Sequence, residues 1–167
     1  MIPDLMAVIS RDLEALRREL DLYPDDASVW SSVKGQPNSA GTLVLHLIGN
    51  LRHFIGTTLG TTGFVRNRDA EFSTRDVPRA ELLSLIDTTR GEVMTTLRGL
   101  SPLSAGETFP LQMNGMSLRT TGMLLHLATH LSYHLGQVDY HRRALTGDAT
   151  GANAMSLQPL AIGAPAP

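Results

Sequence analysis

Residues 126–141 read HLATHLSYHLGQVDYH and carry four histidines at helical spacing. His126, His130 and His134 follow one another at intervals of four residues, and His141 lies seven residues further on. An α-helix turns about 100° per residue, so residues four apart lie on neighbouring turns of one face. The leucines between the histidines form a second, adjacent stripe. The stretch therefore predicts a helix that turns leucines towards a core and holds histidines beside them.

Histidines at the border of a core need hydrogen-bond partners or a metal ion for their ring nitrogens. Two histidines four residues apart on a helix can present one nitrogen each to the same ion, at about 2.0–2.1 Å for zinc. A pair of hydrogen-bonded core histidines explains the spacing of His130 and His134 equally well. The residue after His130 is Leu131 and not Glu, so the general base of the zinc proteases that share this spacing is missing.

The stretch LHLIGNLRH at residues 45–53 offers a third ligand. Its His46 lies on a polar strip beside the apolar face of a second predicted helix. If this strip faces the later histidines, His46, His130 and His134 can form a site of three nitrogens. Three protein ligands leave positions open for water or substrate, which is typical of a reactive metal. Imidazole suits several divalent metal ions, and we expect zinc or nickel.

The apolar periodicity of the whole chain predicts an all-α fold. Apolar residues recur at intervals of three and four in four segments, which prolines and glycines bound. The four predicted helices span residues 2–22, 40–59, 78–100 and 120–145. We expect a four-helix bundle that forms a single domain over residues 1–147. The Gly-, Ala- and Pro-rich tail, residues 148–167, is expected to be extended or mobile.

A short β-hairpin is predicted between the third and fourth helices. Phe109, Leu111 and Met113 alternate with other residues, and the pair Asn114-Gly115 is a strong two-residue turn signal. The hairpin would fill the connection between the two helices.

Composition disfavours several classes of function. The chain has 14 basic and 16 acidic residues, a net charge of −2 and no basic run, so we expect neither a nucleic-acid nor a membrane partner. It has no cysteine, which removes disulfides, thiolate ligands and a cysteine nucleophile. The longest apolar stretch is too short to span a bilayer, and the first residues do not resemble a signal peptide. We therefore expect a cytoplasmic protein.

Three stretches carry a family resemblance. The HxxxHxGQ pattern of His130, His134 and Gln137 resembles the last helix of the DinB/YfiT-like superfamily. The stretches NSAGTLVLHLIGNLRHFIG at residues 38–56 and RNRDAEF at residues 66–72 are similar to one bacterial branch of it. The resemblance implies a four-helix bundle that binds a divalent metal through three histidines, one from the second helix and two from the fourth.

The matching ligand positions are His46, His130 and His134. One departure concerns the chemistry, because many members carry a basic residue where this chain has Leu135. The superfamily includes thiol-dependent transferases and isomerases, and also proteins without a known activity. The resemblance thus implies the metal more strongly than it implies the reaction.

These observations leave two main hypotheses for the function. The first is a metal-dependent enzyme, a hydrolase or thiol S-transferase, in which the ion activates water or a thiol for reaction with a small-molecule substrate. The second is a non-enzymatic metal-binding or stress-related protein that acts through a dimer interface. A homodimer is expected in either case. A nucleic-acid-associated role in damage response is a weaker third hypothesis, which the charge balance disfavours.

Several residues near the expected ligands are candidates for a supporting role. Asn50 and Gln137 each lie one turn from a ligand, where they can hydrogen-bond a ligand or substrate. Contacts between helices explain both residues equally well. His126 is expected to support a ligand and not to bind the ion.

The polar connection after the second helix adds a further group. Arg66, Arg68 and Glu71 can reach over the mouth of the site, although a surface salt-bridge cluster is the simpler interpretation. His53 and His141 lie too far along their helices to share the ion, and for His141 a surface position is expected.

Overall fold

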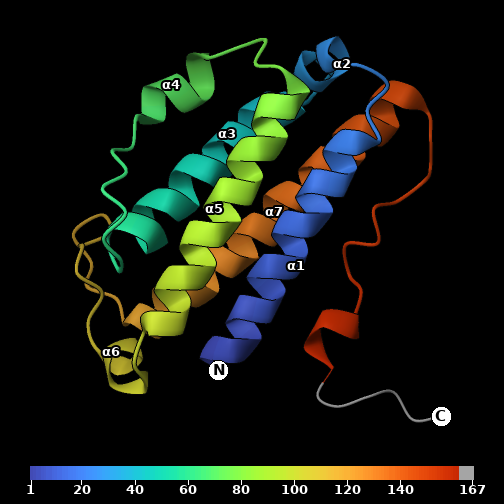
Figure 1. The fold of residues 1–167 in the computed structure, drawn as a ribbon. Helices are drawn as coiled ribbons and strands as arrows, with labels where there is room; N and C mark the ends of the chain where they lie inside the picture. The colour runs from blue at the N-terminus through green and yellow to red at the C-terminus, as the bar shows by residue number, and fades with distance from the viewer. Residues whose placement is uncertain (162–167) are drawn as a thin grey trace, which may run out of the picture.

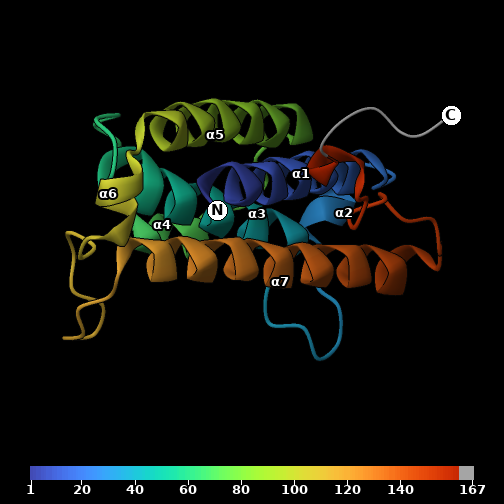
Figure 2. The ribbon, with the colours of Figure 1, turned by 90° about the horizontal axis from the view of Figure 1, so that it is seen from below.

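The computed structural model describes residues 1–161, which are mostly helical. Four long helices lie side by side: α1 (Ile2–Asp21), α3 (Ala40–Leu51), α5 (Arg79–Gly99) and α7 (Thr120–Thr146) (Figure 1). Helices α1 and α3 each pack against both α5 and α7. Figure 2 shows α5 and α7 on opposite sides, with α1 and α3 between them. The all-α prediction is confirmed, whereas the assignment to one type of four-helix bundle stays a prediction.

Four short helices lie in the connections and in the tail. They are α2 (Asp26–Trp30), α4 (Arg68–Ser73), α6 (Pro102–Gly106) and the 3₁₀ helix η2 (Gln158–Leu160). None of the helices in residues 1–161 combines the length and apolar character that a membrane crossing requires.

The ends of the long helices follow local capping signals. The Ser39 hydroxyl accepts a hydrogen bond from the backbone N–H of Thr42 at the start of α3. Pro78 precedes α5, and Gly147 ends α7 in the left-handed conformation that glycine adopts easily. The predicted limits of three helices agree with the structure to within one or two residues.

The second predicted helix differs from the structure in its last turns. It is α-helical only to Leu51, and it continues as the π-helix η1 (Arg52–Thr57). The N–H of Thr58 donates to the carbonyl of His53, five residues back, where an α-helix would use the residue four back. The spacing of apolar residues predicts a helix here but does not show which hydrogen-bond pattern it adopts.

The predicted β-hairpin is wrong, because the connection contains no strand. Two isolated bridges are present, Thr108 with Arg119 and Met113 with Met116. The pairing between them shifts by two residues, and Pro110 in this stretch has no N–H to donate. The turn itself is formed as expected, because its two central residues, Asn114 and Gly115, have positive φ.

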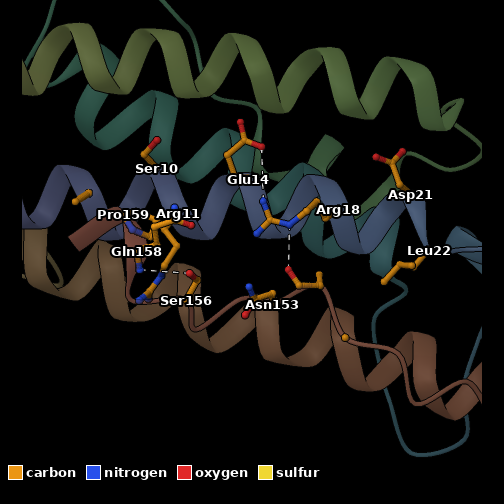
Figure 3. Close-up of a pocket in the computed structure, with 13 residues that line it drawn as sticks. Ser10, Arg11, Glu14, Arg18, Asp21, Leu22, Asn153, Ser156, Gln158 and Pro159 are labelled. Atoms are coloured by element: carbon orange, nitrogen blue, oxygen red, sulfur yellow. Dashed lines mark hydrogen bonds and ion pairs between the residues drawn. The ribbon is translucent and has the colours of Figure 1, made fainter. Parts of the chain in front are cut away.

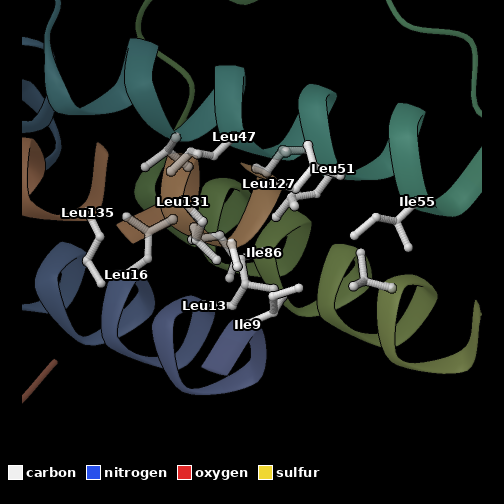
Figure 4. Close-up of a cluster of buried hydrophobic side chains, with 14 of the residues drawn as sticks. Ile9, Leu13, Leu16, Leu47, Leu51, Ile55, Ile86, Leu127, Leu131 and Leu135 are labelled. Carbon is white, nitrogen blue, oxygen red and sulfur yellow. The ribbon is translucent and has the colours of Figure 1, made fainter. Parts of the chain in front are cut away.

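The core is made of the apolar stripes that the sequence predicts. Leucine and isoleucine side chains from all four long helices meet in one buried cluster (Figure 4). Its members include Ile9, Leu13, Leu16, Leu47, Leu51, Ile86, Leu127, Leu131 and Leu135. This cluster fixes α3 beside α7 and therefore brings their histidine-bearing strips together.

The described part of the C-terminal tail is held against α1 and α7 by a buried ion pair. Arg142 is fully buried and donates from Nε to Glu19 Oε2 at 2.7 Å. The same guanidinium donates to the carbonyl oxygens of Asp148 and Thr150, and the N–H of Ala152 donates to Glu19 Oε1. Up to residue 161 the tail is therefore attached, which the sequence did not predict. Residues 162–167 of the predicted tail lie outside the described residues, and the boundary at residue 147 stays a prediction.

The expected surface position of His141 is also wrong. This side chain is fully buried, with Nδ1 2.8 Å from the Tyr23 hydroxyl and Nε2 2.9 Å from the Ser31 carbonyl. A carbonyl only accepts, so Nε2 carries the proton, and Nδ1 shares the Tyr23 hydroxyl proton with the Val138 carbonyl, which lies 3.1 Å from that hydroxyl. Partners from two distant segments thus satisfy a histidine that α7 alone would leave exposed.

Candidate metal centre

Helices α3 and α7 bring three imidazoles together. His46 from α3 and His130 and His134 from α7 each offer a nitrogen, and these nitrogens lie within 4.8 Å of one another. Nε2 of His130 is 3.3 Å from Nε2 of His46 and 3.1 Å from Nε2 of His134. His46 is buried, and the other two are half-buried. The three histidines could therefore hold a metal ion.

Two of the three rings are oriented by a second polar side chain. Nδ1 of His46 lies 3.0 Å from Glu71 Oε2, and Nδ1 of His134 lies 2.6 Å from Gln137 Oε1. Both oxygens accept, so in each neutral ring the proton resides on Nδ1. The lone pairs of the two Nε2 atoms then point towards His130, which is the arrangement that metal-binding histidines adopt.

Hydrogen bonding alone cannot satisfy this cluster. A proton on Nε2 of His130 could be donated to only one of the two lone pairs that face it. A proton on Nδ1 of His130 leaves three lone pairs facing one another, and that buried Nδ1 has no partner among the described residues. A cation satisfies all three Nε2 atoms at once. Three imidazole ligands suit zinc, nickel, copper or iron, so the residues fit the expected divalent ion.

The environment keeps two of the histidines uncharged at neutral pH. Burial lowers the pKa of His130 to about 4, and the neighbouring His134 and His46 add to this effect. Burial also lowers the pKa of His134, although its hydrogen bond to Gln137 acts in the opposite direction. Metal ions bind the neutral form of histidine, so these two histidines need no proton loss at pH 7.

Glu71 reaches the site because α4 lies close to α3. Its buried carboxylate accepts from Arg66 Nε at 2.6 Å and from Arg66 Nη2 at 2.9 Å. Burial alone would raise the pKa of Glu71, but the hydrogen bonds from Arg66 and His46 outweigh burial and lower it. A Cβ atom on Gly49 would lie 2.0 Å from Glu71 Oε1, so this approach requires glycine. The predicted surface cluster is thus partly a buried support for His46.

The remaining candidates lie at different distances from the cluster. Asn50 is buried, and its Oδ1 has no hydrogen-bond partner among the described residues. His126 is exposed, with its ring 5.9 Å from the ring of His130 and no hydrogen bond to it. Arg68 is exposed and lies over the Phe72 ring, 5.0 Å from its centroid, so it is not brought to the histidines.

Phe72 is a neighbour of the site that sequence reasoning missed. Its ring centroid lies 5.0 Å from that of His46, so it covers the imidazole on the side of α4. The only signal in the sequence is its place directly after Glu71. Without the path of the chain, that signal does not distinguish Phe72 from an ordinary core residue.

Comparison with known proteins identifies the family of this chain. The family described as "Protein of unknown function (DUF1572)" matches residues 6–156, which is most of the chain. The chain belongs to the DUF1572 family. That family is part of the DinB/YfiT-like superfamily, as the resemblance of the histidine motif implies. No curated protein and no solved structure matches this DUF1572 member.

For the metal-free protein, we expect the free energy of unfolding to fall as the pH drops from about 6.5 towards 4. The pKa values of His130 and His134 are lowered in the fold, so the unfolded chain binds more protons in this window. The contribution of these two histidines to the free energy of unfolding is complete at pH values above their pKa in the unfolded chain. It is lost as the pH approaches the pKa of His130 in the folded protein, about 4. Urea unfolding across this range measures the change. His130→Gln should reduce the pH dependence, and an unchanged dependence would contradict the expectation.

Proposed function

We propose that this DUF1572 member is a metal-dependent enzyme with the four-helix-bundle architecture of the DinB/YfiT-like superfamily. The observation that supports this is that the Nε2 atoms of three histidine rings converge. In two of these rings, Nδ1 is already hydrogen-bonded to an acceptor. His46, His130 and His134 hold the ion, while Glu71 and Gln137 keep the rings of His46 and His134 in the required tautomer. When bound, a divalent ion lowers the pKa of a water or thiol at its open coordination position.

The reaction class follows from this open position and remains a proposal. Three protein ligands are typical of sites that bind a further small group, so hydrolysis or thiol transfer on a small molecule are the reactions we propose. Zinc or nickel is the expected ion. A cytoplasmic location remains a prediction.

The alternative is a non-enzymatic metal-binding protein that acts as a homodimer. One observation favours a dimer: Leu125, Tyr133 and Tyr140 are large, exposed side chains on the same helix as two of the ligands. In this alternative the ion stabilises the fold and binds no substrate.

Metal analysis tests the proposed site directly. Protein purified without chelators or a nickel column should contain about one divalent ion per chain, and His134→Ala should lose it. His126→Ala is the matched control, since His126 is on the same helix but makes no hydrogen bond to the cluster. A wild-type protein without metal, or a His134→Ala protein that keeps it, would contradict the proposal.

The same variants separate the two functions. If metal loss in His134→Ala leaves the thermal midpoint within a few degrees of wild type, the ion serves a purpose other than stability. If the midpoint falls sharply with the ion, the structural role gains support.

Asn50 is the candidate for the missing partner of His130. Nδ1 of His130 and Oδ1 of Asn50 are the buried side-chain atoms without a partner in the described part of the chain. Nδ1 of His130 becomes a donor when Nε2 of the same ring faces an ion, and Oδ1 of Asn50 is an acceptor. Asn50 lies one turn beyond His46, on the helix that faces His130. We propose that a small rotation joins the two atoms when the metal is bound, which gives all three rings an acceptor.

This role predicts a measurable loss in Asn50→Leu. We expect metal affinity to fall about ten-fold, because a ligand without its acceptor is less basic and less well oriented. Asn50→Asp keeps an acceptor and should retain most of the affinity. In nitrogen-15 NMR spectra of the zinc-loaded protein, the Nδ1 proton of His130 should be visible in wild type and exchange faster in Asn50→Leu. Equal affinities for wild type and Asn50→Leu would exclude the role.

A further inference from the structure

A second site lies between α1 and the C-terminal tail. The two segments line an open cavity of about 770 Å³ (Figure 3). One wall is the face of α1 that bears Arg11, Glu14 and Arg18, and the other is formed by residues 151–159 of the tail. Neither wall contains any of the three clustered histidines, so this cavity is separate from the candidate metal centre.

Arg11 is a buried cation whose outer nitrogens have no partner among residues 1–161. Its side chain is only 6 % exposed, and Nε donates to Asp12 Oδ1 at 2.8 Å. The second oxygen of Asp12 accepts from the Ser132 hydroxyl of α7, so Asp12 is engaged away from the outer nitrogens. Nη1 and Nη2 of Arg11, which lines the cavity, make no hydrogen bond in the part of the chain that is described. These two nitrogens are open to the cavity, so they can donate to an acceptor that enters it.

The tail adds further donors to the lining of the cavity. Ser156 and Gln158 line it together with Arg11, and Figure 3 shows both on the tail segment opposite α1. The Ser156 oxygen accepts from the N–H of Gln158, at 3.4 Å, which leaves its own proton free to donate into the cavity. This wall is held in place, because Arg18 Nε donates to the Ala152 carbonyl at 3.0 Å.

Both carboxylates that line the cavity are already paired with arginines. Glu14 accepts from Arg90 of α5 and lies 4.0 Å from Arg18, and Asp21 lies 3.5 Å from Arg17. Neither carboxylate is paired with the outer nitrogens of Arg11, which stay available to an incoming anion. A guanidinium with two free nitrogens matches the two oxygens of a carboxylate.

We propose that this cavity binds a small organic carboxylate, with the anionic group on Nη1 and Nη2 of Arg11. The volume lies in the range of small-molecule sites. Ala7 and Pro159 line the remainder of the cavity and offer apolar contact to the rest of the ligand. The ligand bridges α1 and the tail, so binding fixes the tail more firmly on the helix.

Titration of the full chain with matched probes tests this site. Hexanoate should shift the backbone amide NMR signals of Ala152, Ser156 and Gln158, and hexanamide, which has the same shape without the charge, should bind at least about ten-fold more weakly. Inorganic phosphate, the other common anion, should also bind more weakly because it makes no apolar contact. Equal binding of hexanoate and hexanamide, or tighter binding of phosphate, would overturn the proposal.

Three variants localise the effect. Arg11→Gln should weaken hexanoate at least about ten-fold. Ala7 lies one helical turn before Arg11, so Ala7→Phe places a bulky ring in the part of the cavity next to Arg11 and should also weaken hexanoate binding. This variant leaves Arg11 and Asp12 in place and provides the test if Arg11→Gln does not fold. Arg98→Gln, which removes an exposed charge on α5, should have no effect. Metal content should be unchanged in all three variants, and hexanoate binding that survives Ala7→Phe would contradict the assignment.

Discussion

Replacing Arg142 with Met is expected to lower the free energy of unfolding by about 3–5 kcal/mol, because it leaves a buried carboxylate without its partner. Glu19 is 1 % exposed and receives its hydrogen bonds from Arg142 and from the backbone of Ala152. Removal of Arg142 also frees the carbonyls of Asp148 and Thr150 that fix the tail. Chemical unfolding with guanidinium chloride measures the loss.

The loss should depend on pH in a defined direction. Burial raises the pKa of Glu19 even in the presence of Arg142. Without the guanidinium that pKa rises further, so Glu19 in the folded variant takes up a proton that the unfolded chain releases. The destabilisation is therefore largest at alkaline pH and smaller in acid.

A neighbouring arginine provides the control. Arg143 is partly exposed and pairs with Asp139, so Arg143→Met should cost no more than about 1 kcal/mol. Similar losses for Arg142→Met and Arg143→Met would show that the buried pair does not stabilise the fold as proposed.

Gly49→Ala is expected to weaken metal binding by about 10- to 100-fold with the three histidines intact. The added methyl group would lie 2.0 Å from Glu71 Oε1 and 2.6 Å from Glu71 Cδ, so the carboxylate must move. The displaced Glu71 can no longer hold Nδ1 of His46, and the ring loses its orientation. Competition with a metal indicator measures the affinity.

Gly91→Ala is the matched control for this prediction. Gly91 is in the interior of α5, and a Cβ atom there would meet nothing within 4 Å. Alanine has the higher helix propensity, so Gly91→Ala should raise stability by about 0.5–1 kcal/mol without a change in metal affinity. If Gly49→Ala bound metal as tightly as wild type, the contact between Gly49 and Glu71 would not matter for the site.

The parts of the fold that were predicted correctly are those that depend on short stretches of sequence. The limits of a helix follow from proline, glycine and capping residues within a few positions of its ends. The Asn114-Gly115 turn follows from the identity of its two central residues. The hairpin around that turn failed because strand pairing depends on register and on the N–H groups of both segments, and Pro110 interrupts one of them. The π-helical end of α3 was missed for a similar reason, since periodicity does not reveal a change in hydrogen-bond pattern.

The three-histidine cluster was accessible from the sequence because helical geometry alone sets which residues share a face. A spacing of four places His130 and His134 on neighbouring turns, and the leucine stripes of α3 and α7 turn both histidine strips towards each other. The resemblance to the superfamily indicated the same three histidines. Local periodicity thus identified the candidate residues, whereas the meeting of the two strips depended on how α3 packs against α7.

Tertiary structure alone decided what surrounds that site. Glu71 supports His46 only because α4 crosses α3 at a glycine, and His141 is buried only because Tyr23 and Ser31 reach it from the other end of the chain. The same holds for the tail, which is attached by Arg142 and Glu19, two residues that are 123 positions apart in the sequence. Each of these contacts joins residues that no local pattern relates, because their proximity depends on how whole helices pack and not on the turn of one helix.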